Sequence, residues 1–151
     1  MRTIERDIVS AVIISKDEKV LQALQNPDGG GVYPGHWGLI GGGIEEGESQ
    51  RKALDREVLE ESGIDISEYP VSLIDEAEGE SNKILRETGE KVFCKMKFYT
   101  YQVKIDDRIA LNIPVILDDE HTKYSWTLLS ELSSMKLTPP SVVLFTKLGY
   151  L

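Results

Sequence analysis

Three glutamates, Glu57, Glu60 and Glu61, lie within about one turn of a predicted helix. At ~100° per residue, their side chains fall within an arc of roughly 100°. Like charges at this spacing destabilise a helix by about 0.2–0.5 kcal/mol per pair, so we expect a cation to neutralise them. Carboxylate oxygens suit hard ions such as Mg²⁺ or Mn²⁺, which commonly share their coordination sphere with phosphates. The pattern therefore predicts metal-assisted chemistry on a phosphate compound.

The helical wheel places the first and last of these acids on the same side as Ala53, Leu54 and Val58. It directs three other side chains away from that side, namely Lys52, Asp55 and Ser62. Carboxylates that border a core must either protonate or pair with a cation. The alternative is a solvated helix face with ion pairs one turn apart, such as Arg56 with Glu60.

The spacing around these acids resembles the Nudix box. Gly42 is followed after five residues by Glu48, and after seven more by Arg56-Glu57-Val58-x-Glu60-Glu61-x-Gly63-Ile64. Every fixed position of the box is present, which makes the motif specific. Residues 31–39 and 124–126 are also similar in order and spacing to a Nudix domain, so the resemblance covers most of the chain.

The resemblance implies a role for each part of the box. The metal ligands would be three side chains and one backbone carbonyl, namely Glu57, Glu60, Glu61 and Gly42. Glu48 and Arg56 would form a supporting ion pair between the loop and the helix. The bound Mg²⁺, or Mn²⁺, would orient and activate a water, and one of the catalytic glutamates would take its proton.

Nudix enzymes commonly draw a further carboxylate from a loop outside the box. Glu120, in Asp118-Asp119-Glu120-His121, is the best-placed candidate for this catalytic role. Two neighbouring aspartates are of the same type, and an acidic turn between strands is the alternative interpretation.

The residues around the acids indicate how the chain positions them. Three glycines at 41–43 permit positive φ and close approach of a loop to a ligand. Glu48 or Ser49 can cap the following helix, and Gly63 suits a left-handed C-terminal cap. We therefore predict a helix from about Ser49 to Ser62.

Apolar and alternating runs predict strands on both sides of this helix, at residues 7–15, 20–25, 37–40, 71–77, 92–104 and 124–128. Residues 82–91 are polar and predict a hairpin tip near the ligand pocket, and Pro139-Pro140 predicts the start of a last helix. Strands mixed with a central and a terminal helix favour an α/β domain. The resemblance specifies a single Nudix domain over residues 1–151, an α/β/α sandwich with a mixed β-sheet.

Bulk properties limit the partners. The chain has 151 residues with 40% hydrophobic content, which suits one domain. A formal charge of -9 disfavours nucleic-acid binding, while a small nucleotide can bind through bridging metal ions. No secretory or membrane-spanning segment is predicted, so we expect a cytoplasmic protein without a membrane partner. Cys94 fits a buried strand, and either a monomer or a homodimer is compatible with the sequence.

The expected substrate is a nucleoside triphosphate, with a deoxynucleotide favoured, cleaved to a nucleoside monophosphate and pyrophosphate. Residues 31–45, with Gly41 where many relatives have proline, look like bacterial Nudix nucleoside triphosphatases, and so does the ending Leu-Gly-Tyr-Leu. A nucleotide-sugar hydrolase of the GDP-mannose type is the alternative enzyme. A catalytically silent nucleotide-binding module is the alternative from another class, although the complete set of acids disfavours it.

Overall fold

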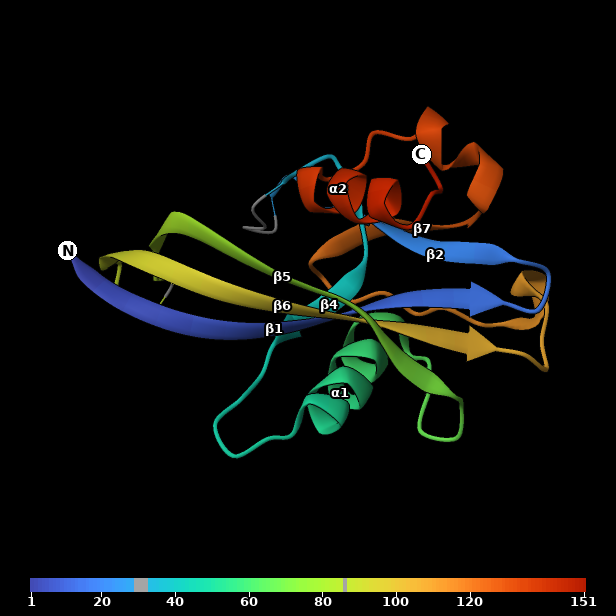
Figure 1. The fold of residues 1–151 in the computed structure, drawn as a ribbon, viewed down its shortest axis with the longest axis horizontal. Helices are drawn as coiled ribbons and strands as arrows, with labels where there is room; N and C mark the ends of the chain where they lie inside the picture. Colours follow the sequence, from blue (N-terminus) through green and yellow to red (C-terminus); the bar gives the residue numbers. More distant parts are fainter. Residues whose placement is uncertain (29–32, 86) are drawn as a thin grey trace.

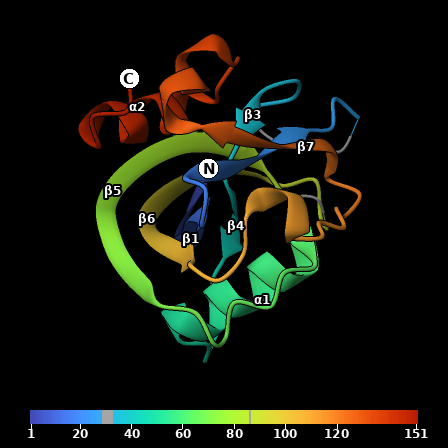
Figure 2. The same ribbon diagram turned by 90° about the vertical axis from the view of Figure 1, so that its right-hand side faces the viewer.

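A mixed β-sheet with a helix on each face forms the centre of the molecule (Figures 1 and 2). The computed structural model describes residues 1–28, 33–85 and 87–151. Within these ranges the strands are β1 (Arg2–Ser15), β2 (Lys19–Gln25), β3 (Trp37–Gly38), β4 (Ile40–Gly43), β5 (Val71–Ile84), β6 (Lys91–Ile105) and β7 (His121–Leu128). The α-helices are α1 (Gln50–Ser62) and α2 (Pro139–Lys147), and two 3₁₀ helices span Ala110–Asn112 and Leu129–Ser134. The predicted α/β/α sandwich is confirmed.

The sheet is ordered β3-β2-β1-β6-β5, with β4 paired to β1 and β7 paired to β2. β1 and β6 are parallel over their whole length, and the other pairs are antiparallel. The amino-terminal half of β1 continues with β5 and β6 as a long ribbon beyond the two helices (Figure 1). Because β4 pairs only with residues 8–11 of β1, its glycines lie at the middle of the molecule, beside α1.

Alternate residues of β1 face two separate cores, as the period of a strand requires. Val9, Ala11 and Ile13 pack toward α1, together with its buried residues Ala53, Leu54 and Val58. Val12 and Ile14 pack on the opposite face, against Leu144 and Phe145 of α2. α1 is therefore fixed to the sheet by the same side of the helix that carries Glu57 and Glu61.

Several elements extend further than the sequence patterns predict. β1 begins at Arg2 because its pairing with β6 starts there, and β5 continues to Ile84 in register with β6. These extensions are polar and exposed, so they lack the apolar alternation that marks a strand. The predicted strand 37–40 is two short strands, one paired with β2 and the other with β1.

The predicted hairpin between β5 and β6 is confirmed, although the two strands stay paired as far as Ile84 and Lys91. Part of the predicted motif at 31–39 lies outside the described residues, as does residue 86 of the predicted segment 82–91. None of the described helices is long and apolar enough to cross a membrane.

The predicted bounds of α1 are confirmed by its caps. Ser49 accepts a hydrogen bond from the Lys52 N–H at 3.2 Å, and Gly63 has a φ of 73°. One detail of the helical wheel is wrong, because Ser62 is buried instead of exposed. Its hydroxyl donates to the Val58 carbonyl at 2.6 Å, which satisfies it inside the core.

Candidate active site

Arg56 is the centre of the ionic contacts on α1. Its guanidinium donates to the two carboxylate oxygens of Glu48 at 2.7 and 2.8 Å, and to Glu57 at 2.9 Å. It also reaches the Gly43 carbonyl at 3.0 Å and Glu60 at 3.4 Å. The contacts to Glu48 lower the pKa of that carboxyl to about 2, because Arg56 hydrogen-bonds its ionised form. One cation thus ties the loop before α1 to both β4 and the helix.

Glu57 lies against the backbone of Gly42. A Cβ atom added at Gly42 would stand 2.5 Å from the Glu57 carboxylate, so only glycine leaves room for this acid. Burial raises the pKa of Glu57, Arg56 opposes that rise, and the charges of Glu60 and Glu120 add to it. A missing side chain on β4 therefore creates the space that the first of the three acids occupies.

Glu61 is the most buried acid of the cluster, with only 5% of its surface exposed. Its carboxylate accepts a hydrogen bond from the Gly41 N–H at 2.9 Å. Burial raises the pKa of Glu61 to about 9; this N–H opposes the rise, and negative charges on Glu57, Asp118 and Glu120 increase it. No Lys or Arg forms an ion pair with Glu61 in the described part of the chain.

Successive residues of β4 direct their backbone N–H and C=O groups to opposite edges of the strand, which decides which glycine backbone contacts α1. The Gly41 N–H and the Gly43 carbonyl both bond to side chains of α1. Because successive residues of a strand direct their backbone groups to opposite edges, the Gly42 carbonyl points to β1, opposite Val9. The predicted backbone ligand, the Gly42 carbonyl, therefore lies on the β1 edge of the strand, whereas the Gly41 backbone lies on the edge that contacts α1. The glycines belong to a strand rather than a loop, and none of the three has a positive φ.

Glu60 differs from the other two acids of the helix. Its side chain is 59% exposed, in keeping with the helical wheel, which places only Glu57 and Glu61 on the apolar side of the helix. It projects from the α1 surface beside Arg56 and raises the pKa of Glu57 through its charge. Glu57 and Glu61 thus form the buried part of the cluster, and Glu60 lies at its solvent side.

The loop before β7 brings further acids to α1, as the sequence predicts for Glu120. The charge of Glu120 raises the pKa of both Glu57 and Glu61, which places it within the same electrostatic cluster. Ligand atoms of Asp118, named above as a neighbour of the same type, and of His121, which sequence reasoning missed, lie with one of Glu61 in a group within 4.8 Å of one another. Their positions depend on the strand register at the start of β7, which the motif does not encode.

This donor set fits a divalent cation. Carboxylates from α1 and from the loop before β7 converge beside the backbone of β4, while Arg56 is shared among Glu48, Glu57 and Glu60. Like charges in a partly buried site raise one another's pKa unless a cation compensates them. Oxygen donors at a surface that remains open on the Glu60 side are suited to Mg²⁺ or Mn²⁺ that keeps part of its water shell.

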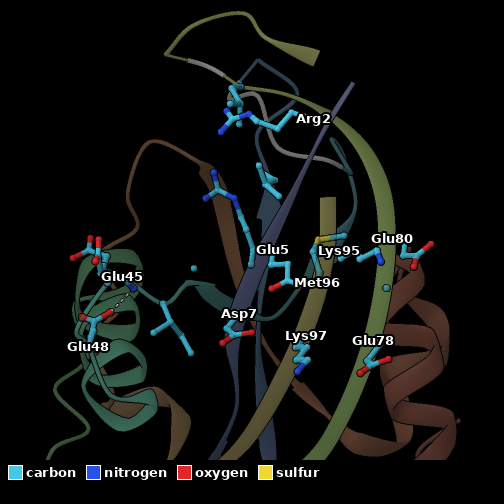
Figure 3. A pocket seen from close by; sticks show the side chains of 17 residues that line it. Arg2, Glu5, Asp7, Glu45, Glu48, Glu78, Glu80, Lys95, Met96 and Lys97 are labelled. Carbon is cyan, nitrogen blue, oxygen red and sulfur yellow. Dashed lines mark hydrogen bonds between the residues drawn. The ribbon is translucent and has the colours of Figure 1, made fainter. Parts of the chain in front are cut away.

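A hollow of about 920 Å³ lies beside the ribbon, at the Glu48 end of the acid cluster (Figure 3). Leu85 of the hairpin lines it, and two lysines of β6 project into it between acids on the neighbouring strands. By strand register, Lys95 lies between Glu5 and Glu80, and Lys97 lies between Asp7 and Glu78. These lysines are therefore compensated by the sheet itself, which disfavours them as dedicated phosphate ligands.

Comparison with known proteins gives a consistent result. The family model of the NUDIX domain matches residues 5–147 of the sequence. The chain is 27% identical over 150 residues to the nucleoside triphosphatase NudI of Enterobacter sp. (strain 638), covering 97% of this chain and 99% of the relative. It is 31% identical over 109 residues to NudI of Salmonella schwarzengrund (strain CVM19633), covering 70% and 71%.

Solved structures show the same architecture. The MutT protein from Methanosarcina mazei Go1 is 26% identical and superimposes with a TM-score of 0.63, covering 97% of this chain and 94% of that one. The E. coli dihydroneopterin triphosphate pyrophosphohydrolase is 20% identical with a TM-score of 0.70, covering 93% and 92%. The second likeness concerns the fold alone.

Proposed function

We propose that this chain, which belongs to the Nudix family and is a MutT-like Nudix hydrolase, cleaves a nucleoside triphosphate to a nucleoside monophosphate and pyrophosphate in a Mg²⁺-dependent reaction. A deoxynucleotide is the favoured substrate. Relatives named nucleoside triphosphatase support this substrate class, because one of them aligns over nearly the whole of both chains. The proposal extends to a small cytoplasmic enzyme that acts on free nucleotides.

The observation that carries the proposal is the convergence of buried carboxylates on one side of α1. Glu57 and Glu61 lie within the fold, where their negative charges are unfavourable without a counter-ion. A polyphosphate cannot approach such a site by itself, since its oxygens are also negative. A divalent cation resolves both repulsions at once, which explains why an acidic surface can bind an acidic substrate.

Each residue then has a defined task. Glu57, Glu60 and Glu61, with the Gly41 carbonyl, would hold the cation, which when bound neutralises phosphate oxygens and lowers the pKa of a water. Arg56 and Glu48 keep α1 aligned with β4. Glu120 lies on the separate loop before β7, and we propose that it accepts the proton of the attacking water.

A substrate panel tests the proposed reaction. Purified protein would be incubated with Mg²⁺ and deoxynucleoside triphosphates, ribonucleoside triphosphates or nucleotide sugars, and the products separated by chromatography. We expect a nucleoside monophosphate and pyrophosphate. Release of a sugar from a GDP-mannose type substrate would favour the alternative enzyme, and calorimetric binding of a nucleotide without any product would favour a silent binding module.

A matched pair of variants tests the site. Glu61→Gln keeps the shape of the side chain but removes its ionisable carboxyl, so we expect kcat to fall by roughly 10²–10⁴-fold, as for the loss of other essential acid–base or electrostatic groups. Glu68→Gln changes an exposed glutamate after α1 and should leave the rate unchanged. A folded Glu61→Gln protein with the parental rate would remove Glu61 from the site.

A further inference from the structure

Resting on the proposed metal-dependent function, we propose that His121 supplies a nitrogen ligand beside Glu61 and Asp118, so that one ion position favours Mn²⁺ or a similar transition ion over Mg²⁺. Ligand atoms of the three residues lie within 4.8 Å of one another. Ligands ~2.1 Å from a single ion are ~3.0 Å apart when adjacent and ~4.2 Å apart when opposite. Movements of about half an ångström would therefore bring the group to coordination distances.

A β-bulge directs His121 into this position. In the pairing of β7 with β2, Lys123 lies opposite Leu24 and His121 lies opposite Gln25, which leaves Thr122 as an extra residue. If Thr122 instead paired with Gln25 in regular alternation, His121 would be on the α2 face of the sheet. The bulge moves it to the α1 face, which also carries Trp126. Bulges of this kind re-aim side chains near active sites.

The His121 side chain is buried and only half of its hydrogen-bonding capacity is used. It is 7% exposed, and its Nδ1 atom lies 2.8 Å from the Asp118 carboxylate. Among the described residues, no hydrogen bond is made by Nε2. With Nδ1 and this carboxylate oxygen as adjacent ligands of one ion, their separation of 2.8 Å is close to the ~3.0 Å expected, and the ring proton lies on Nε2.

The surrounding backbone holds the loop in place for this role. The Asn26 N–H donates to the Glu120 carbonyl at 2.9 Å, and the Asn26 side chain donates to the Asp119 carbonyl at 3.2 Å. These two hydrogen bonds from Asn26, the residue after β2, therefore anchor the residues between Asp118 and His121. A ligand pair three residues apart on an anchored loop needs little reordering when an ion binds.

The choice of metal follows from the donor types. Carboxylates alone suit Mg²⁺, whereas imidazole raises the affinity for transition ions. A position with two carboxylates and one imidazole is therefore selective in a way that an all-oxygen site is not. The Nudix box does not contain this nitrogen, because it comes from a loop more than fifty residues later in the chain.

Pulsed electron paramagnetic resonance on the Mn²⁺-loaded protein tests the assignment directly. The protein would carry no affinity tag and no nucleotide, whose nitrogens would give similar signals. We expect a nitrogen coupling to Mn²⁺ that changes when the protein is made with ¹⁵N-histidine. The chain has two histidines, and His36 bonds to the nearby Pro34 carbonyl instead. His36→Gln should keep the coupling, and His121→Gln should abolish it.

Affinity measurements separate ligation from a structural role. We expect His121→Gln to weaken Mn²⁺ binding by about 10–100-fold and to weaken Mg²⁺ binding much less. Equal losses for both ions, or a nitrogen coupling absent from the parental protein, would overturn the proposal. If His121→Gln fails to fold, the labelled parental protein and His36→Gln still decide the question. Coupling without nucleotide hydrolysis would retain this metal site and refute the proposed function, while hydrolysis without coupling would do the opposite.

Discussion

Metal binding to this protein should release about one proton per ion at neutral pH. The source is Glu61, whose pKa is raised to about 9 by burial and whose carboxylate accepts a hydrogen bond from the Gly41 N–H. At pH 7 that carboxyl is ~99% protonated without metal, since the pH lies two units below the pKa. An ion that binds the carboxylate must displace this proton.

The magnitude follows from the same pKa. Binding at pH 7 should be about 100-fold weaker than binding to the fully ionised site, equivalent to ~2.7 kcal/mol. The apparent affinity should therefore increase about tenfold per pH unit up to pH ~9 and then level off. The raised pKa of Glu57 adds a smaller contribution of the same sign.

Isothermal titration calorimetry with Mn²⁺ measures this release. Titrations at one pH in two buffers of different ionisation enthalpy give the number of protons transferred. We expect close to one for the parental protein at pH 7, and much less at pH 10. The Glu61→Gln variant should bind Mn²⁺ weakly and should not release the proton that Glu61 releases in the parental protein. Full-affinity binding by the parental protein at pH 7 with no proton transfer would refute the reasoning, because Glu61 would then be ionised or outside the site.

Four further results are expected. Gly42→Ala places a Cβ 2.5 Å from the Glu57 carboxylate and should reduce kcat by roughly 100-fold while circular dichroism stays unchanged. Arg56→Lys loses the paired contacts to Glu48 and should lower the free energy of urea unfolding by about 1–3 kcal/mol. Without metal, the folded state holds the Glu61 proton from pH ~4.5 to ~9, so stability should fall across that window as pH rises, and Glu61→Gln should remove the trend. The lowered pKa of Glu48 has the opposite sign: its stabilisation is complete above pH ~4.5 and is lost as pH falls toward 2, which acid titration of the melting temperature measures.

The parts of the fold that follow local rules were predictable from sequence. Ser49 and Gly63 predict the ends of α1 because capping depends on side-chain oxygens and on positive φ at single residues. The extended strands were not, because residues 2–6 of β1 and 78–84 of β5 are polar on both faces. Their pairing with β6 provides backbone hydrogen bonds, which form without any apolar pattern in the sequence.

The same distinction between local and tertiary control applies to the candidate site. Glu57 and Glu61 are predictable as neighbours because one helical turn sets their separation, whereas the exposure of Glu60 depends on how far α1 rotates against the sheet. The edge to which a backbone carbonyl points is decided by strand pairing, so the motif alone does not indicate that the Gly42 carbonyl lies on the β1 edge and that the Gly41 N–H bonds to Glu61.

The start of β7 is the clearest case of tertiary control. Counting alternate residues back from Trp126 assigns Thr122 to the α1 face and His121 to the other. The bulge leaves Thr122 unpaired and places His121 on the α1 face, and only the pairing with β2 reveals it. Deleting Thr122 would remove the extra residue and leave His121 directly before Lys123 and opposite Gln25, so regular alternation would keep the imidazole on the α1 face. The Mn²⁺–nitrogen coupling should then persist in a protein whose helices remain intact by circular dichroism, and its loss would show that pairing opposite Gln25 is not enough to position the imidazole.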